Sequence, residues 1–388
     1  MPEYDANAAS LPETPRAALW ASTMDGYDGN RIRTAHYDSW ATVGLPMTVE
    51  RPAREDQEKD LLAAGATRAA GAGDRLVEEV PDLFRTCFER DRDRILHATA
   101  FRRLAGKTQV FVFPEDHQRS RLTHALEVAQ VARAIACSLG LNVPLTEAIA
   151  LGHDCGHGPG GHASEDALSP YVDGGYNHAQ WGADVTLAPL NLCRETLDGV
   201  RNHSWSCPAP ATPEGEVVSW ADRIAYVCHD FEDAVHTGIV DPADLPAVVR
   251  VRCGSVRREQ LSTFIGGVVG ASASSGRIGM DQDTAAALGA FRAFDYERIY
   301  LRPASVDQAA LVIALLRALV DHFTEAPGDL PTDALHGFED HSGTDAVRLA
   351  AVHHVGGMTD RYACRSATRL LGWSTERLPA GLDVGVYT

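Results

Sequence analysis

The sequence is poor in basic residues: its 388 residues include 35 Lys and Arg against 53 Asp and Glu, a formal net charge of −18. Binding to nucleic acid in general, or to an anionic membrane surface, needs basic side chains that displace counterions. The charge balance therefore argues against both functions. It does not exclude a small basic pocket for a phosphate-bearing ligand.

Long apolar runs and paired cysteines are also missing. No run of about twenty apolar residues occurs, so no membrane span is predicted, and the N-terminus has no charged-then-apolar signal pattern. The eight cysteines contain no C-x-x-C pair. Scattered cysteines of this kind favour free thiols in a reducing cytoplasm over a disulfide framework or a thiolate metal site. We therefore expect a cytoplasmic protein.

Strand signal is sparse, and apolar residues instead recur at helical spacing over most of the chain. The sequence therefore predicts an all-α fold with little or no β structure. Residues 121–139 form the strongest predicted helix, with Gly140 as its stop, and Pro144 marks the first turn of the next helix, which ends at His153. Further helices are expected over residues 16–22, 192–203, 216–235, 281–301, 305–325, 343–355 and 358–372. A short strand or an extended crossover is expected over residues 107–113, and a mobile loop over the Ser-rich residues 272–276.

Three parts are expected along the chain. Residues 1–80, dominated by Ala, Gly, Pro, Asp and Glu, are predicted to be a weakly ordered N-terminal extension. Residues 81–240 are predicted to form the core that carries the site, and residues 241–388 a C-terminal helical part packed on that core. Trp20 and Trp40 in the extension could dock on the body of the protein or on a neighbouring subunit.

Chemistry-bearing residues concentrate in residues 153–165. A pair such as His153-Asp154 is usually an exposed polar dipeptide, but this pair follows the apolar run 148–151, which should be buried. Unpaired charge is costly inside a protein, so the pair needs a partner, and the histidines that follow it favour a metal ion or a phosphate. Imidazole nitrogen and carboxylate oxygen suit Zn, Mn, Fe or Ni, and carboxylates also suit Mg.

Two predicted helices carry further candidates. His124 lies beside the apolar stripe of helix 121–139, where a single His is more often a hydrogen-bonded core residue. On helix 216–235 a polar stripe begins at Asp222, and such a stripe is usually a solvated acidic face. Asp222, however, sits next to the apolar residues Ala221 and Ile224. It also shares its side with the aromatic ring of Tyr226, and both features argue against that interpretation.

Five segments, in this order, resemble the motifs of the deoxynucleoside triphosphate triphosphohydrolases, the dGTPase-like branch of the HD-domain phosphohydrolases. They are RDRILH…FRRL…KTQV (92–110), RLTHALEV (121–128), HDCGHGPGGH…E (153–165), WADRIAY (220–226) and GMTDRYA (357–363). The match spans about residues 80 to 372. The resemblance implies an HD-domain helical bundle with additional C-terminal helices.

The resemblance also implies one divalent cation per active site, which could be Mn, Mg, Fe, Co, Ni or Zn. Four residues would be its ligands: His124, His153, Asp154 and Asp222. Four further residues would be catalytic: His157, His162, Glu165 and His178. Of these, His162 and Glu165 would act on the leaving group or the attacking water, and the other two would line the phosphate site.

Six residues would bind the substrate by the same resemblance: Gln109, Arg121, Arg223, Tyr226, Asp230 and Arg361. The arginines 121 and 223 would hold triphosphate oxygens, because a polyanion needs guanidinium forks. Gln109 and Asp230 would hydrogen-bond the sugar 3′-hydroxyl. Tyr226 would pack where a 2′-hydroxyl would otherwise sit.

Together these residues imply a dNTP triphosphohydrolase. A metal-activated water would attack the α-phosphorus, and His162 would protonate the 5′-oxygen, so that deoxynucleoside and tripolyphosphate are released in one step. Family resemblance further implies a homo-oligomer and a nucleotide activator. Two alternatives stay open: an HD-domain phosphohydrolase of another nucleotide (a nucleoside monophosphate, an alarmone or a cyclic dinucleotide) and a non-catalytic nucleotide sensor.

The chain departs from the family pattern at two places. Pro159-Gly160-Gly161-His162 stands where the family usually has Pro-Phe-Gly-His, and the loss of that Phe removes a packing anchor beside the catalytic His. We therefore expect a looser loop and a lower or conditional activity. The segment between residues 203 and 216 is short and Pro-rich, so the family's base preference does not carry over.

Overall fold

The structure is a computed structural model of the chain, and it describes residues 14–28, 31–44, 47–114, 117–332, 334 and 343–380. The chain divides into two compact units, Met1–Val49 and Glu50–Thr388. The first unit contains α1 (Pro15–Ser22) and a two-stranded antiparallel sheet of β1 (Tyr27–Asp28) and β2 (Arg33–Thr34). None of its described residues is buried. The helix predicted at residues 16–22 is confirmed.

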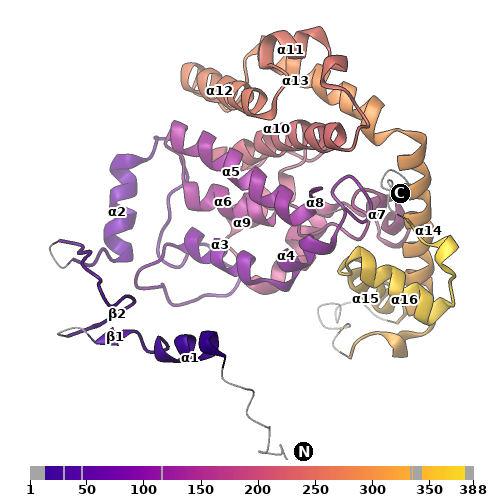
Figure 1. Cartoon of the computed structure of the whole chain (residues 1–388), viewed down its shortest axis with the longest axis horizontal. Coiled ribbons are helices and arrows are strands. Elements are labelled where there is room, and N and C mark those ends of the chain that lie inside the picture. The colour runs from indigo at the N-terminus through magenta and orange to yellow at the C-terminus, as the bar shows by residue number, and fades with distance from the viewer. Residues whose placement is uncertain are drawn as a thin grey trace, which may run out of the picture. The chain divides into compact units, whose positions relative to one another are not determined.

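The second unit is built from helices (Figure 1), and the all-α prediction is confirmed. Within the described ranges, β1 and β2 of the first unit are the only strands. Its α-helices are α2 (Arg51–Leu61), α3 (Cys87–His97), α4 (Thr99–Arg103), α5 (Arg121–Leu139), α6 (Val143–Gly152), α7 (Ala163–Leu168), α8 (His178–Trp181), α9 (Arg194–Asn202), α10 (Pro213–His236), α11 (Ala247–Cys253), α12 (Arg257–Ser275), α13 (Gln282–Asp295), α14 (Pro303–Glu325), α15 (Thr344–Gly356) and α16 (Asp360–Leu371). Short helical turns join them: η1 (Leu104–Gly106), η2 (Ser169–Tyr171), η3 (Gly182–Thr186), η4 (Ala188–Leu190), η5 (Pro242–Asp244), η6 (Tyr296–Tyr300), η7 (Pro327–Asp329) and η8 (Thr375–Arg377).

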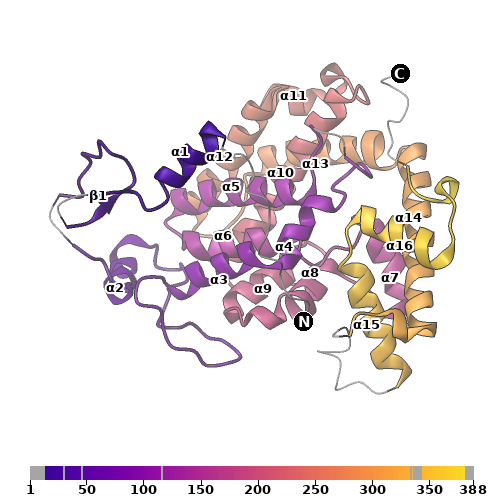
Figure 2. The same cartoon turned by 60° about the horizontal axis from the view of Figure 1, so that its bottom comes forward.

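Two hydrophobic clusters organise this unit. In the larger cluster, α5 packs against α6 and α10, while α3 and α9 pack against α6. Helices α11, α12 and α13 lie along the other side of α10 (Figure 1). The smaller cluster joins α7 to α14, α15 and α16, which lie together in both views (Figure 2). The candidate site lies on helices of the larger cluster and on the loop that leads into α7.

Local signals set the ends of the helices that carry the site. A capping box opens α5, and left-handed Gly140 (φ +65°) ends it, so the predicted bounds 121–139 are confirmed. Asn142 caps α6 by accepting a hydrogen bond from the Leu145 N–H at 3.2 Å. The helix stops one residue before His153. This stop places the His-Asp pair in a turn, where adjacent side chains can approach the same point.

Two segments differ from the sequence prediction. The charged residues 51–61 form α2, because side-chain hydrogen bonds hold the helix against the residues that follow it. In one of these bonds the Glu58 carboxylate accepts from the Ala69 N–H at 2.7 Å. The prediction of a mobile loop at 272–276 is wrong, since residues up to 275 complete α12. Ser272 is buried there, and its hydroxyl contacts the N–H and the carbonyl of Gly279 at 3.1 and 3.2 Å.

The segment 107–113 forms no strand, in agreement with an extended crossover, and Thr108 makes a single bridge to Ser120.

The boundary between the compact units lies between residues 49 and 50, so α2 belongs to the second unit. The division of the chain at residues 80 and 240 stays a prediction.

One helix among those that the structure describes, α14, is long and apolar enough to cross a membrane. The sequence analysis predicts no span. A helix packed in a compact domain can have the same length and composition, and 28% of the apolar stretch of α14 is buried, on the face that contacts α7, α15 and α16 in the smaller hydrophobic cluster. The structure therefore shows α14 as a helix with one packed face.

Candidate functional site

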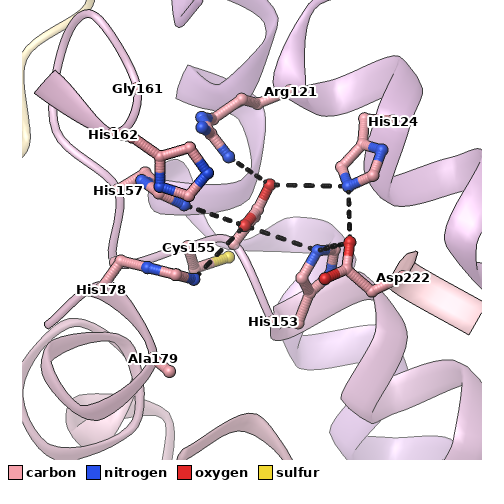
Figure 3. A network of polar contacts seen from close by, with 12 residues as sticks. Arg121, His124, His153, Cys155, His157, Gly161, His162, His178, Ala179 and Asp222 are labelled. Atoms are coloured by element: carbon pink, nitrogen blue, oxygen red, sulfur yellow. Dashed lines mark hydrogen bonds and ion pairs between the residues drawn. The ribbon is translucent and has the colours of Figure 1, made fainter. Parts of the chain in front are cut away.

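The four predicted metal ligands converge, although they come from three helices and lie up to 98 residues apart in the sequence. His124 stands in the first turn of α5, the His-Asp pair follows α6, and Asp222 lies within α10. His124 Nε2 is 3.0 Å from Asp222 Oδ1, and His153 Nε2 is 3.7 Å from the same oxygen. Asp154 Oδ1 is 3.4 Å from His153 Nε2. Figure 3 shows His124, His153 and Asp222 pointing toward one another.

The chemistry of this donor set fits a cation. His153 Nδ1 lies 2.6 Å from the Ala150 carbonyl oxygen, and only a protonated Nδ1 can donate there, so in the neutral imidazole Nε2 carries the lone pair. That Nε2 is buried without a hydrogen-bond partner among the described residues, and it faces carboxylate oxygens, which are electron-pair donors as well. The ligand atoms of His124, His153 and Asp154 lie within 4.8 Å of one another. A divalent metal ion would satisfy all of these donors.

Arg121, in the first position of α5, lies beside this donor set. Its Nη1 is 2.6 Å from Asp154 Oδ2, and both side chains are buried. Burial disfavours the Asp154 carboxylate, but Arg121, His153 and His157 outweigh it and hold the pKa of Asp154 well below its usual value. The Nε and Nη2 atoms of Arg121 are buried and have no hydrogen-bond partner in the part of the chain that the structure describes. These N–H groups could donate to the oxygens of a phosphate.

A second group of residues follows the His-Asp pair and centres on Glu165. Its Oε1 lies 2.8 Å from His178 Nδ1 and accepts from the His178 backbone N–H at 2.8 Å, while Oε2 lies 3.2 Å from His162 Nδ1. Burial opposes ionisation, but the hydrogen bonds from His162 and His178 lower the pKa of Glu165 far below its usual value. The carboxylate therefore orients both imidazoles. The side chain of His162 is 75% exposed, so its Nε2 is free to reach a substrate.

His157 connects the two groups. Its Nε2 is 3.2 Å from Asp154 Oδ1, and its ring stacks on that of His178 at 3.7 Å between centroids. Burial, Arg121 and His178 lower the pKa of His157 well below its usual value. His157 is therefore a neutral hydrogen-bonding group in the site.

The structure adds His203, which the sequence analysis missed. Its Nε2 lies 3.3 Å from His178 Nε2, and its ring is 4.9 Å from that of His153. Burial, His153 and His178 lower the pKa of His203 to about 3. A signal was present: like His153 after α6, His203 directly follows a helix (α9), and its Nδ1 bonds to the carbonyl three residues earlier.

Two predicted sugar-binding residues lie further along α10, four and eight residues after Asp222. The Tyr226 hydroxyl accepts from Arg292 Nε at 2.8 Å, and the Asp230 carboxylate accepts from the Tyr300 hydroxyl at 2.7 Å. Burial raises the pKa of Asp230 to about 7, although the Tyr300 hydrogen bond opposes this. Arg292 and Tyr300 were not predicted, but their spacing of two turns on the expected helix 281–301 places them on one face.

Arg223 lies beside Asp222 on α10, and its guanidinium stacks over the ring of Trp205 at 3.4 Å from the centroid. Its buried Nε has no hydrogen-bond partner among the residues that the structure describes. Trp205 is 47% exposed and comes from the Pro-rich segment between α9 and α10. The sequence analysis flagged this segment without identifying the aromatic residue that holds the arginine.

The remaining predicted residues differ in their placement. Gln109 is half-buried in the crossover, and none of the described residues forms a hydrogen bond with its Oε1. Arg361 is exposed in the first turn of α16, and no contact within the described part of the chain joins it to the other predicted residues. Its role in substrate binding stays a prediction.

The two glycines before His162 shape the loop. Gly160 and Gly161 have φ values of +72° and +64°, and a Cβ on Gly160 would lie 2.4 Å from Val312 Cγ1 of α14. The Gly160 N–H donates to Asp360 Oδ1 at 2.9 Å. Val312 therefore occupies the space that a side chain at position 160 would need. The contact with Val312 and the hydrogen bond to Asp360 hold the loop in place. The expected lower activity stays a prediction.

Two segments of the chain match known domain models. Residues 121–227 match the HD domain, and residues 278–369 match the phosphohydrolase-associated domain. A deoxyguanosinetriphosphate triphosphohydrolase-like protein of Caldanaerobacter subterraneus subsp. tengcongensis is 38% identical over 320 residues, which are 81% of this chain and 93% of that protein. Proteins of the same description from Clostridium perfringens and Jannaschia sp. are 35% and 37% identical, over 75% and 83% of this chain and 89% and 98% of theirs.

Proposed function

Since the chain belongs to the deoxyguanosinetriphosphate triphosphohydrolase-like family of HD-domain phosphohydrolases, we propose that it is a metal-dependent dNTP triphosphohydrolase. Its reaction would convert a deoxynucleoside triphosphate to deoxynucleoside and tripolyphosphate. The convergence of His124, His153, Asp154 and Asp222 beside the unsatisfied guanidinium of Arg121 carries the proposal, because it combines a cation site with an anion site.

These four convergent side chains would hold one divalent metal ion, whose identity among Mn, Mg, Fe, Co, Ni and Zn is open. When bound, such an ion polarises phosphoryl oxygens and makes water easier to deprotonate. The two carboxylates offset the charge of the ion. Arg121, anchored through one nitrogen to Asp154, would direct its other N–H groups at the triphosphate.

The loop residues would handle the proton. The 5′-oxygen is a poor leaving group unless it is protonated. Glu165 fixes the Nδ1 side of His162, so the exposed Nε2 would carry the proton to that oxygen. His157 and His178, stacked behind it, would line the phosphate site.

The residues along α10 would recognise the nucleoside and the outer phosphates. Asp230 and Gln109 would bind the sugar 3′-hydroxyl, and Tyr226 would occupy the space of a ribose 2′-hydroxyl. Arg223, held flat on Trp205, would bind triphosphate oxygens. Arg361 would complete the set of substrate-binding residues.

The direct test is to incubate the purified protein with each dNTP and with Mn, Mg or Co. Tripolyphosphate and deoxynucleoside should appear together, and His124→Ala should abolish their release, while His236→Ala, at an exposed histidine of α10, should not. Release of inorganic phosphate or pyrophosphate alone would contradict the proposed chemistry.

A second candidate is hydrolysis of another nucleotide by the same site. The Pro-rich segment that carries Trp205 contacts Arg223, which is proposed to bind the substrate, so this segment could change which nucleotide is accepted. Competition between ribonucleotides and deoxyribonucleotides separates the two candidates.

We also propose a cytoplasmic location and a homo-oligomer with a nucleotide activator. The exposed side chains of Trp20 (62%) and Trp40 (87%) in the first unit support an assembly.

A further inference from the structure

A buried carboxylate, that of Asp360, lies where three distant segments of the chain meet. It stands at the first position of α16, and only 5% of the residue is exposed. The crossover 107–113 and the loop that leads to His162 both bond to it. Asp360 is neither a proposed metal ligand nor a proposed substrate-binding residue. Since a charge is costly to bury, its place in the structure needs a reason in the contacts that surround it.

Both oxygens of Asp360 accept hydrogen bonds, and each oxygen serves a different segment. Oδ1 accepts from the Gly160 N–H at 2.9 Å, two residues before His162. Oδ2 accepts from the Thr108 N–H at 2.9 Å and from the Thr108 hydroxyl at 2.5 Å, one residue before Gln109. The two partner residues lie 200 and 252 positions from the carboxylate in the sequence. One side chain therefore holds two segments that carry proposed functional residues.

An ionised carboxyl group suits this position. Burial raises the pKa of Asp360, but the hydrogen bonds from Thr108 and Gly160 and the positive charge of Lys107 oppose that rise. A carboxylate accepts at both oxygens, whereas a carboxamide has one accepting and one donating end. All three partner groups are donors, so only a carboxylate can bond to both segments at once. Hydrogen bonds to a charged acceptor are also stronger than neutral ones.

A second connection joins the same segments. Lys107 Nζ donates to the carbonyl oxygens of His157 and, at 2.9 Å, of Gly356 in the residues that lead into α16. The loop and the crossover are also in close contact, because a Cβ on Gly161 would lie 3.1 Å from the Thr108 carbonyl oxygen. A displacement of one segment would therefore move the others.

We infer that Asp360 is a positioning residue for the proposed reaction. Through Gly160 it fixes the loop that carries His162, and through Thr108 it fixes the crossover that carries Gln109. The inference rests on the proposed function, because its consequences are changes in proton transfer and in sugar binding. A misplacement of about 1 Å far from the chemistry can lower a rate about a hundredfold.

The first test compares the steady-state kinetics of wild type, Asp360→Asn and Asp345→Asn with a dNTP. Asp345 is the matched control, since it is an exposed aspartate in the first turn of α15. Asp360→Asn should lower kcat about ten- to hundredfold and raise KM about two- to tenfold, with bound metal unchanged by elemental analysis. Asp345→Asn should behave as wild type. Wild-type kinetics of Asp360→Asn would overturn the inference.

A double-mutant cycle separates positioning from a general loss of stability. If Asp360 acts through His162, its substitution should matter little once that imidazole is gone. In the His162→Gln background, Asp360→Asn should therefore lower kcat less than about threefold. The same fold-loss of kcat in both backgrounds would show that Asp360 has a structural role only, and would overturn the inference.

Variants of Thr108 test the same connection from the other side. Thr108→Val removes the hydroxyl donor but keeps the N–H, so it should change kcat and KM in the same directions as Asp360→Asn and by a smaller factor. Thr108→Ser keeps a hydroxyl group and should restore both constants toward wild type. Equal values for the Val and Ser variants would contradict a role for the bond to Asp360.

Hydrogen exchange tests the contacts without any turnover. Asp360→Asn should speed amide exchange at residues 157–162 and 107–110, and Asp345→Asn should not. Unchanged exchange at both segments would overturn the inference, whether or not wild type is active. A wild-type protein that releases no tripolyphosphate from any dNTP would instead contradict the proposed function, so the two failures are distinguishable.

Discussion

The two sides of the candidate site are built differently. On the helix side, His124, His153 and Asp222 come from α5, from the turn after α6 and from α10, and the helices of the larger hydrophobic cluster hold them. On the loop side, His162 follows two left-handed glycines, and its side chain is 75% exposed against 2% for that of His124. The position of the proposed metal ion is thus a property of the core, and the position of the proposed proton donor is a property of one loop. Damage to one side should leave the other side intact.

The largest expected effect comes from the helix side. Asp222→Asn keeps the shape of the side chain but removes a charge next to two imidazole nitrogens. We expect loss of bound metal, measured by elemental analysis, and a loss of at least about ten-thousand-fold in kcat/KM, which corresponds to about 5 kcal/mol. Asp184→Asn, at an exposed ion pair with Arg201, is the control and should behave as wild type. Full metal content in Asp222→Asn would contradict the ligand assignment.

The loop side should show the opposite pattern. His162→Gln removes the proton donor while the helix side keeps its geometry, so kcat should fall by about two to three orders of magnitude with metal content unchanged. Glu165→Gln should lower kcat less, because His162 remains but loses its orienting carboxylate. If either variant lost its metal, the division into two independent sides would be wrong.

The helix side also contains a buried carboxyl group beyond the proposed ligands. This group should make the stability of the folded protein depend on pH. Asp295 of α13 is fully buried, and within the described ranges neither of its oxygens has a hydrogen-bond partner. Burial, followed by the nearby Asp230, raises the pKa of Asp295 well above its usual value, so the folded protein holds a proton that the unfolded chain releases near pH 4. The stability that Asp295 contributes is therefore present below about pH 4 and is lost as the pH rises toward its folded pKa.

Asp295→Asn removes this titration. The free energy of unfolding of the variant, relative to wild type, should increase between pH 5 and pH 8 by up to about 1.4 kcal/mol per pH unit, measured by urea denaturation. Asp283→Asn, at an exposed residue of the same helix, is the control. Parallel pH profiles for wild type and Asp295→Asn would show that Asp295 is ionised in the folded protein.

The smallest effect is expected at the mouth of the site. Trp205→Ala removes the ring under Arg223, and a cation–π contact is worth about 0.5–2 kcal/mol. KM for the triphosphate should rise roughly three- to thirtyfold, with kcat nearly unchanged. Trp373→Ala removes a similar stacking contact with Arg377 on the smaller cluster and should leave KM unchanged. A change in kcat without a change in KM would show that Trp205 acts on the chemical step, as the loop residues are proposed to do, and not on substrate binding.

The sequence predicted those parts of the fold that depend on local signals. The bounds of α5 followed from its apolar stripe and from Gly140, and α6 followed from Asn142 and Pro144. Residues 51–61 and 272–275 were missed, because buried hydrogen bonds such as that of Glu58 or Ser272 compensate for a polar composition. Helices α11 and α12 had no predicted counterpart, although each ends at a glycine with positive φ, Gly254 and Gly276.

The candidate site was predicted where its residues belong to recognisable motifs. The structure brings the four proposed ligands together, and it also brings in His203, Arg292, Tyr300 and Trp205, which stand alone in the sequence. A single His, Arg or Trp on a helix has many ordinary roles, so only its neighbours in space give it a functional meaning.

The residue order by itself determined which side chains could bind a cation and where the helices that carry them begin and end, because caps, glycines and apolar periodicity act over a few residues. Tertiary structure alone decided that residues 98 positions apart share one point, that Val312 takes the space beside Gly160, and that a cavity forms behind the loop that carries two of the proposed ligands. These features arise from contacts between distant segments, and such contacts depend on how whole helices pack against one another.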